Sequence, residues 1–226
     1  MNTRDDSSSR RPALIFDFGN VVAHFDYAKT CAHFGRRLGI SGEAFLERVR
    51  SRGLTPLVQH YESGRMNAGA FSRAVCALAG LVLTHDEFAS AWSDIFRPNE
   101  PIGRLIPILK RRGYTLVLGS NTNDLHAAQF RAQFAETLVH FDHLVLSYEI
   151  GHLKPSAPFY LACAEATGVP PESCIFIDDL VENVEGAREV GLIGLHFRDM
   201  PTLLDDLAAL GVEFLDAERV QIIEGR

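Results

Sequence analysis

A short apolar run that ends in an aspartate constrains this chain more than any other stretch. Residues 13–16 read Ala-Leu-Ile-Phe, Asp17 follows directly, and Gly19 and Asn20 come within the next three positions. An apolar run bounded by turn-forming residues is typical of a buried strand. In an open parallel sheet the carboxyl ends of the strands form the ligand crevice, so Asp17 would lie in that crevice. Taken alone, the same aspartate could simply begin a turn.

The second half of the chain alternates between short apolar runs and amphipathic stretches. We expect strands at 115–120, 143–147, 174–178 and 193–197, and helices at 101–113, 124–134, 158–168, 182–191 and 201–211. This alternation predicts an α/β fold with a doubly wound, Rossmann-like parallel sheet. Together with the first strand, it assigns residues 12–26 and 98–222 to one core domain.

Residues 27–97 show a different pattern. Apolar residues recur there at helical spacing, broken by glycines and a proline, and no strand pattern is evident. We therefore expect four or five short helices that form a small separate domain, inserted after the first strand of the core. Trp92 lies at helical spacing from Phe88 and Phe96, which favours packing over ligand contact.

The charge and hydropathy of the chain argue against two classes of partner. Lysine and arginine number 22 against 29 aspartate and glutamate residues, a formal net charge of −7. Such a balance is poorly suited to nucleic acid or an anionic membrane surface. No run approaches the ~18–20 apolar residues of a membrane span. We expect a small-molecule substrate, no nucleic acid or membrane partner, and a monomer or homodimer.

The termini and the four cysteines suggest no chemistry of their own. Residues 1–11 are polar and serine-rich, so we expect a disordered tail and not a secretory signal. Residues 223–226, Ile-Glu-Gly-Arg, match a protease recognition sequence common in expression vectors and are set aside as a possible vector remnant. The cysteines form neither a close pair nor a metal-type spacing, which predicts reduced thiols and a cytoplasmic location.

Polar side chains occur where the predicted strands end, at Asp17, Ser120, Lys154 and the pair Asp178 and Asp179. Parallel strands bring these ends to one edge of the sheet. Three converging carboxylates repel one another unless a cation holds them, and carboxylate oxygens suit Mg²⁺. Lys154 would add a fixed positive charge. Ser120 and the backbone N–H groups after it could bind phosphate oxygens.

These segments, taken in order, resemble the four motifs of the haloacid dehalogenase (HAD) superfamily. The matching residues are 16–21 (Phe-Asp-Phe-Gly-Asn-Val), 119–123 (Gly-Ser-Asn-Thr-Asn), Lys154-Pro155, and 176–179 (Phe-Ile-Asp-Asp) with Asn183. The resemblance extends over residues 13–211, and the helical insertion resembles the helical cap of that superfamily. The first two motifs are most similar to a branch that includes glucose-1-phosphate phosphatases.

The resemblance implies a role for each motif residue. Asp17 would be the nucleophile that attacks phosphorus and forms an aspartyl-phosphate, which water hydrolyses. Ser120 and Asn121 would bind the phosphoryl group, and Lys154 would bind it too and stabilise the intermediate. The implied ligands of Mg²⁺ are Asp17, Asp178, Asp179 and the main-chain carbonyl of Gly19.

A few further residues could either contact the substrate or serve the structure alone. Substrate contacts in this superfamily come mostly from the cap, where Arg65 is the residue we expect to contact a sugar or ester, and residues 62–64 are typical of a turn. We expect Asn183 to support the aspartate loop and His126 to have no ligand role.

One position departs from the superfamily pattern. Most of its phosphatases carry a second aspartate two positions after the nucleophile, as general acid and base, and here that position is Gly19. Three explanations stay open: the substrate has a good leaving group, water or His24 replaces the acid, or turnover is slow. Loss of a general acid costs roughly 10²–10⁴ in rate.

The sequence therefore predicts a Mg²⁺-dependent phosphatase for small phosphorylated metabolites, with a sugar phosphate favoured. One alternative is a haloacid dehalogenase, which uses the same nucleophile without a metal, although the aspartate pair at 178–179 would be unhelpful around a departing halide. The other alternative is a catalytically weak binding or regulatory protein of the same fold, which Gly19 leaves open.

Overall fold

The computed structural model describes residues 11–226. Its centre is a five-stranded sheet in the order β5-β4-β1-β6-β7, and all neighbouring strands are parallel. The strands are β1 (Ala13–Phe16), β4 (Leu116–Ser120), β5 (His143–Leu146), β6 (Cys174–Asp178) and β7 (Ile193–His196). The predicted α/β fold with a parallel sheet is confirmed.

Five of the eight helices described in the sheet domain follow the predicted ranges within a few residues, and the other three were not predicted. The eight helices are α6 (Glu100–Arg111), α7 (Asp124–Gln133), α8 (Ala135–Leu138), α9 (Ser147–Ile150), α10 (Ala157–Thr167), α11 (Val181–Glu189), α12 (Met200–Ala209) and α13 (Asp216–Glu224). Within residues 11–226, no helix combines the length and apolar character needed to cross a membrane.

Three of these helices had no sequence prediction. α8 and α9 have four residues each, which is too short for a periodic pattern. α13 buries only Ile222, so it lacks an apolar stripe. It also contains Ile223 and Glu224, which belong to the C-terminal segment 223–226 that matches a protease recognition sequence. The predicted tail, 1–11, lies outside the described residues except for Arg11.

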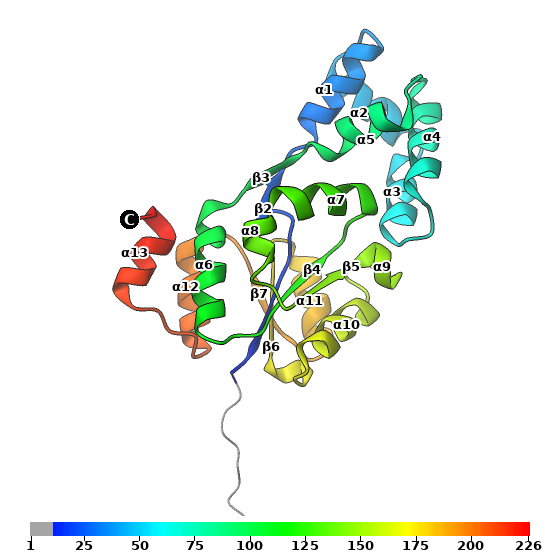
Figure 1. Cartoon of the computed structure of the whole chain (residues 1–226). Helices are drawn as coiled ribbons and strands as arrows, with labels where there is room; N and C mark the ends of the chain where they lie inside the picture. The colour runs from blue at the N-terminus through cyan, green and yellow to red at the C-terminus, as the bar shows by residue number, and fades with distance from the viewer. Residues whose placement is uncertain (1–10) are drawn as a thin grey trace, which may run out of the picture.

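The sheet is buried on both faces, and the sequence of β1 shows how. Leu14 and Phe16 point to one face, and Ala13 and Ile15 to the other, because side chains alternate along a strand. Helices α6, α7, α12 and α13 pack on the first face, and α10 and α11 on the second (Figure 1). Since β1 is the middle strand, Asp17 emerges between the ends of β4 and β6.

Five helices between β2 (Ala23–Phe25) and β3 (Phe96–Pro98) form a bundle that we call the cap. They are α1 (Ala28–Arg37), α2 (Gly42–Arg50), α3 (Leu54–Glu62), α4 (Ala68–Ala79) and α5 (His85–Ser93). The cap has its own apolar core, in which Trp92 packs 4.9 Å from Phe71 and 5.6 Å from Phe88, centroid to centroid. Trp92 is thus a packing residue, as predicted. Figure 1 shows the cap at one end of the molecule, joined through the antiparallel pair β2 and β3.

The turn after α3 joins the cap to the sheet domain. The Ser147 hydroxyl, at the start of α9, donates to the carbonyl oxygen of Glu62 at 2.7 Å. Gly64 has a φ of 68°, and a Cβ atom there would lie 2.3 Å from the carbonyl oxygen of Tyr148. Both the positive φ and the close approach require glycine. The cap therefore contacts the core through backbone at this turn.

Gly64→Ala should destabilise the protein more than Gly80→Ala. Both glycines have positive φ, 68° and 77°, but a Cβ atom at Gly80 would meet nothing within 4 Å. Gly80→Ala therefore measures only the free energy that an alanine loses in a left-handed backbone conformation, about 1–2 kcal/mol. Gly64→Ala adds the clash with Tyr148, which we expect to cost at least ~1 kcal/mol more.

The free energy of unfolding, measured by urea denaturation, tests this difference. Equal losses in the two variants would show that the contact between Gly64 and Tyr148 contributes nothing to stability.

Candidate active site

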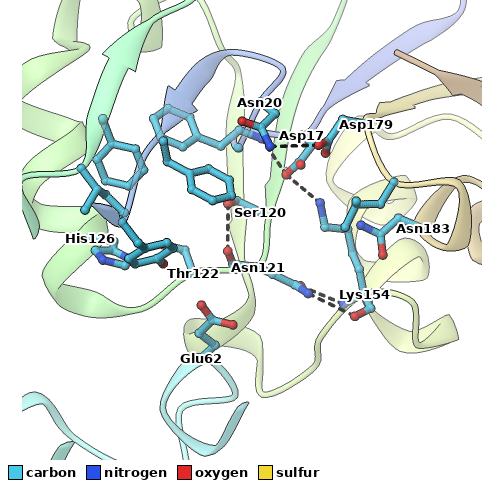
Figure 2. Close-up of a pocket in the computed structure, with 17 residues that line it drawn as sticks. Asp17, Asn20, Glu62, Ser120, Asn121, Thr122, His126, Lys154, Asp179 and Asn183 are labelled. Carbon is cyan, nitrogen blue, oxygen red and sulfur yellow. Dashed lines mark hydrogen bonds and ion pairs between the residues drawn. The ribbon is translucent and has the colours of Figure 1, made fainter. Parts of the chain in front are cut away.

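The carboxyl ends of β1, β4 and β6 open into a pocket of about 210 Å³. Asp17, Ser120, Lys154 and Asp179 line it, and Figure 2 shows their side chains gathered there. These residues are far apart in the chain and meet because β4 and β6 flank β1. The predicted meeting of strand ends is therefore observed.

Asp17 follows β1 directly, and backbone contacts fix it. Its N–H donates to the carbonyl oxygen of Ile177 on β6 at 2.9 Å, and the Phe18 N–H donates to its Oδ1 at 2.7 Å. Burial raises the pKa of Asp17 to about 7; Lys154 opposes this rise, and the neighbouring carboxylates add to it. A buried carboxylate in this position depends on nearby positive charge to stay ionised.

Lys154 provides that charge. Its Nζ lies 2.6 Å from Asp17 Oδ1 and 2.7 Å from Asp178 Oδ2, and it donates to the Gly119 carbonyl oxygen at 3.2 Å. Burial disfavours the ammonium ion, but the two carboxylates outweigh that effect and raise the pKa of Lys154 above its usual value. Lys154 is therefore a charged group held in one position.

The two aspartates at the end of β6 have different surroundings. Asp178 is fully buried, and its Oδ1 accepts hydrogen bonds from the Leu180 N–H and the Asn183 amide, both at 2.9 Å. Asp179 is partly exposed in the pocket wall. Asn183 thus holds the aspartate loop, the supporting role expected for it, although its partner is Asp178.

Three carboxylates could hold a metal ion here. Asp17, Asp178 and Asp179 each place one oxygen within 4.8 Å of the others. Oxygen ligands with negative charge suit Mg²⁺. Asp17, Gly19 and Asp179 line the pocket, whereas both Asp178 oxygens are occupied by protein donors.

The two residues at the end of β4 have separate roles. Ser120 is buried and lines the pocket, in the place expected for a phosphate-binding residue. The Asn121 side chain instead ties two loops together: its Oδ1 accepts from the Lys154 N–H at 2.8 Å, and its amide donates to the Lys154 carbonyl oxygen at 3.1 Å. It therefore fixes the backbone that carries Lys154.

Asn20 is a site residue that sequence reasoning missed. Its φ is 56°, the left-handed region that asparagine tolerates better than most residues. Its side-chain amide donates to Asp179 Oδ2 at 3.0 Å. Asn20 therefore orients Asp179 from the loop that follows the nucleophile; in the sequence it stood within the motif 16–21 without a role of its own.

The space beside Gly19 is occupied by an aromatic ring. A Cβ atom on Gly19 would lie 2.9 Å from Phe25 Cε1. Both residues line the pocket. His24, one of the candidates to replace the missing acid, is exposed on β2 and does not line the pocket. The structure therefore removes His24 from the candidates, because alternation along β2 turns it away from Gly19.

The cap contributes Tyr27 and Glu62 to the pocket. Glu62 was expected only as part of a turn, and Tyr27 was not singled out. The structure does not bring Arg65 to the pocket: it is exposed and borders a separate hollow beside His152. The reason is the tight turn at Gly64, which points the chain away after Glu62. Tyr27 and Glu62 also border an apolar cavity of about 350 Å³ within the cap.

His126 forms part of the pocket wall as a neutral side chain. Its Nδ1 accepts from the Asn123 amide at 3.0 Å, and its Nε2 donates to the Trp92 carbonyl oxygen at 3.2 Å. Burial lowers the pKa of His126 to about 4. With both nitrogens engaged, His126 is a structural link between cap and core, which agrees with the expected lack of a ligand role.

Comparison with known proteins matches this architecture. A family model described as haloacid dehalogenase-like hydrolase matches residues 12–191. A D-ribitol-5-phosphate phosphatase of Bacteroides thetaiotaomicron is 29% identical over 79% of this chain and 87% of its own length. A phosphatase of Mycobacterium tuberculosis is 35% identical over 88% of this chain and 94% of its own.

Solved structures show the same fold. A HAD family enzyme of Bacteroides thetaiotaomicron, in complex with magnesium and inorganic phosphate, has a TM-score of 0.71 at 23% identity, covering 84% of this chain and 95% of its own. The L-2-haloacid dehalogenase of Xanthobacter autotrophicus has a TM-score of 0.62 at 18% identity, covering 93% and 88%. The family match includes every strand end that lines the pocket. This chain belongs to the haloacid dehalogenase-like hydrolases.

Proposed function

We propose that this protein is a Mg²⁺-dependent phosphomonoester hydrolase that acts on small phosphorylated metabolites through an aspartyl-phosphate. The observation that carries the proposal is the position of the Asp17 carboxylate, 2.6 Å from a buried Lys154 and grouped with two further carboxylates. Two relatives that are named as phosphatases support it.

Asp17 is the group suited to attack phosphorus. Phe18 and Lys154 both engage Oδ1, so Oδ2 carries the reacting lone pair. When Oδ2 bonds to phosphorus, the ester P–O bond breaks, and its electron pair leaves with the alcohol oxygen. Water then attacks phosphorus, the bond to Asp17 breaks, and phosphate is released. Lys154 stabilises negative charge on the phosphoryl oxygens.

Asp17, Asp179 and the carbonyl oxygen of Gly19 would hold Mg²⁺, and Asp178 would position Lys154. We assign Asp179 to the metal and Asp178 to Lys154 because Asp179 lines the pocket and Asp178 does not. The chemistry that Mg²⁺ supplies in such a site is neutralisation of charge on the phosphate. Asn20 supports the arrangement by holding Asp179 Oδ2.

A sugar or polyol phosphate is the substrate class that we propose to test first. A pocket of about 210 Å³ limits the substrate to a small molecule, and Asn20, Thr122 and Glu62 offer polar groups for hydroxyls. One relative is named as acting on D-ribitol 5-phosphate. Because the cap also holds an apolar cavity that Tyr27 and Glu62 border, alkyl and aryl phosphates belong in the same panel.

Asp17→Asn should abolish turnover and leave the fold intact. An amide has nearly the same shape as a carboxylate but is a far weaker nucleophile. Lys154 keeps Asp178 as its partner in this variant. Phosphate release from the substrate panel and the thermal unfolding curve are the measurements, with exposed Asp205→Asn as control.

Phosphate release by Asp17→Asn above a trace of the wild-type rate would mean that another group is the nucleophile.

Metal removal should stop the reaction, and the two aspartates should respond differently to substitution. EDTA should abolish phosphate release and Mg²⁺ should restore it. We expect Asp179→Asn to raise the Mg²⁺ concentration needed for half-maximal rate, with little change in thermal stability. Asp178→Asn should lower stability by about 1–3 kcal/mol, because Leu180, Asn183 and Lys154 lose a charged acceptor.

Magnesium titrations and thermal melts of both variants separate these effects. Hydrolysis that resists EDTA would favour the dehalogenase alternative, and halide release from 2-haloacids would then be measured. Phosphate binding without turnover would favour the weak binding protein.

A further inference from the structure

The position two residues after the nucleophile carries no proton donor in this protein. Gly19 has no side chain, and a Cβ atom there would lie 2.9 Å from the Phe25 ring, so a side chain at this position would have to displace that ring. An ester of an ordinary alcohol still needs a proton on its departing oxygen, because an alkoxide is a poor leaving group. Some other group in the pocket must supply that proton, or the enzyme can use activated esters only.

Few titratable groups line the pocket: Asp17, Tyr27, Glu62, His126, Lys154 and Asp179. Asp17 is the nucleophile, and Asp179 is assigned to the metal. Lys154 is paired with two carboxylates. His126 has both nitrogens engaged by protein groups. Burial raises the pKa of Tyr27 far above neutrality, which makes its hydroxyl a very weak acid. Glu62 remains.

Glu62 has an unengaged carboxyl group directed into the pocket. It is the last residue of α3 and lines the pocket, and Figure 2 shows its carboxylate facing the pocket. Within residues 11–226, no hydrogen bond or ion pair reaches this carboxylate. A carboxyl group that is partly buried without a protein partner is free to contact a bound ligand.

The backbone of Glu62 is held on the core, so this position is defined. The Ser147 hydroxyl donates to the Glu62 carbonyl oxygen at 2.7 Å and accepts from the Thr122 N–H at 2.9 Å. Ser147 therefore links Glu62 to the loop that follows Ser120. On the other side, the Tyr61 hydroxyl contacts the Asp124 carboxylate. The cap presents Glu62 to the pocket at a fixed point.

We propose that Glu62 is the general acid and base of this enzyme, in place of the missing carboxylate at position 19. This role rests on the proposed phosphatase function. In the first step Asp17 bonds to phosphorus, the ester P–O bond breaks, and the leaving oxygen takes the proton of the Glu62 carboxyl group. In the second step the Glu62 carboxylate takes a proton from the attacking water, the Asp17–phosphorus bond breaks, and phosphate leaves. Both residues return to their starting states.

The environment of Glu62 agrees with this role. Burial raises the pKa of Glu62 to about 7, and Lys154 partly opposes the rise. The other charged or titratable groups around the same pocket are Tyr27, His126, Asp17 and Asp179. A carboxyl group with a pKa near neutrality can hold a proton for the first step and release it for the second.

Glu62→Gln separates acid catalysis from a structural role. The substrates are ethyl phosphate, phenyl phosphate and 2,4-dinitrophenyl phosphate, whose leaving groups need progressively less protonation. In single-turnover measurements we expect Glu62→Gln to slow formation of the aspartyl-phosphate from ethyl phosphate roughly 10²–10⁴-fold. The same step with 2,4-dinitrophenyl phosphate should change less than about threefold, since its leaving group needs no proton. Exposed Glu47→Gln, also in the cap, serves as control.

The pH profile provides a second readout. The wild-type pH profile with ethyl phosphate should have an alkaline limb on which the rate falls above about 7, because Glu62 loses the proton that it donates; the acid limb reports ionisation of the nucleophile Asp17. Glu62→Gln should lack this decline, and Glu62→Asp, which keeps an ionisable group, should retain it.

Equal slowing for all three esters, or no effect on ethyl phosphate, would overturn the assignment of Glu62 while phosphatase activity stands. A wild-type protein that releases phosphate from none of them and from no member of the metabolite panel would overturn the proposed function itself, and the role of Glu62 with it.

Discussion

The buried ammonium group of Lys154 is the interaction on which the site depends. It lies between Asp17 and Asp178 and is almost inaccessible to solvent. Two buried carboxylates this close would repel each other and lose their charge without it. The removal of one partner from a buried ion pair typically costs ~3–5 kcal/mol, because an uncompensated charge remains. The side chain of Asn121 holds the backbone of Lys154 in place by hydrogen bonds to both its N–H and its carbonyl group.

The order of strands in the sheet turns this local arrangement into a pocket. β1 lies between β4 and β6, so the loops after these three strands face one another. Asp17, Ser120 and Asp179 each follow or end a strand that is fully buried. A buried strand has no freedom to shift its register by one residue without exposing its apolar side chains. The apolar sequence of the sheet therefore sets the positions of the polar residues at its edge.

The cap completes the pocket through both backbone and side-chain contacts with the core. Ser147 and Tyr148, on the short helix α9, contact the turn that contains Glu62 and Gly64. The aromatic core of the cap reaches the pocket wall through Trp92, whose indole ring stacks on His126 at 5.6 Å between centroids. The neutral state of His126 follows from this burial. The contacts of the cap with the core thus include the Trp92–His126 stack and the Tyr61 hydroxyl on the Asp124 carboxylate, and neither of them engages the carboxyl group of Glu62.

The sequence by itself determined the parallel α/β fold and a helical insertion of four or five helices, of which the structure has five. It also determined that Asp17, Ser120, Lys154 and the pair Asp178–Asp179 meet at one edge of the sheet. These follow from periodicity along the chain and from the rule that parallel strands end at one edge. Only the tertiary structure decided which cap residue reaches the pocket, that Asn20 holds Asp179, and that Phe25 fills the space beside Gly19. The sequence offered Arg65 as a substrate contact and His24 as one candidate for the missing acid, but a left-handed turn at Gly64 and the alternation along β2 direct them elsewhere. Such outcomes depend on contacts between residues far apart in the chain, which no local pattern encodes.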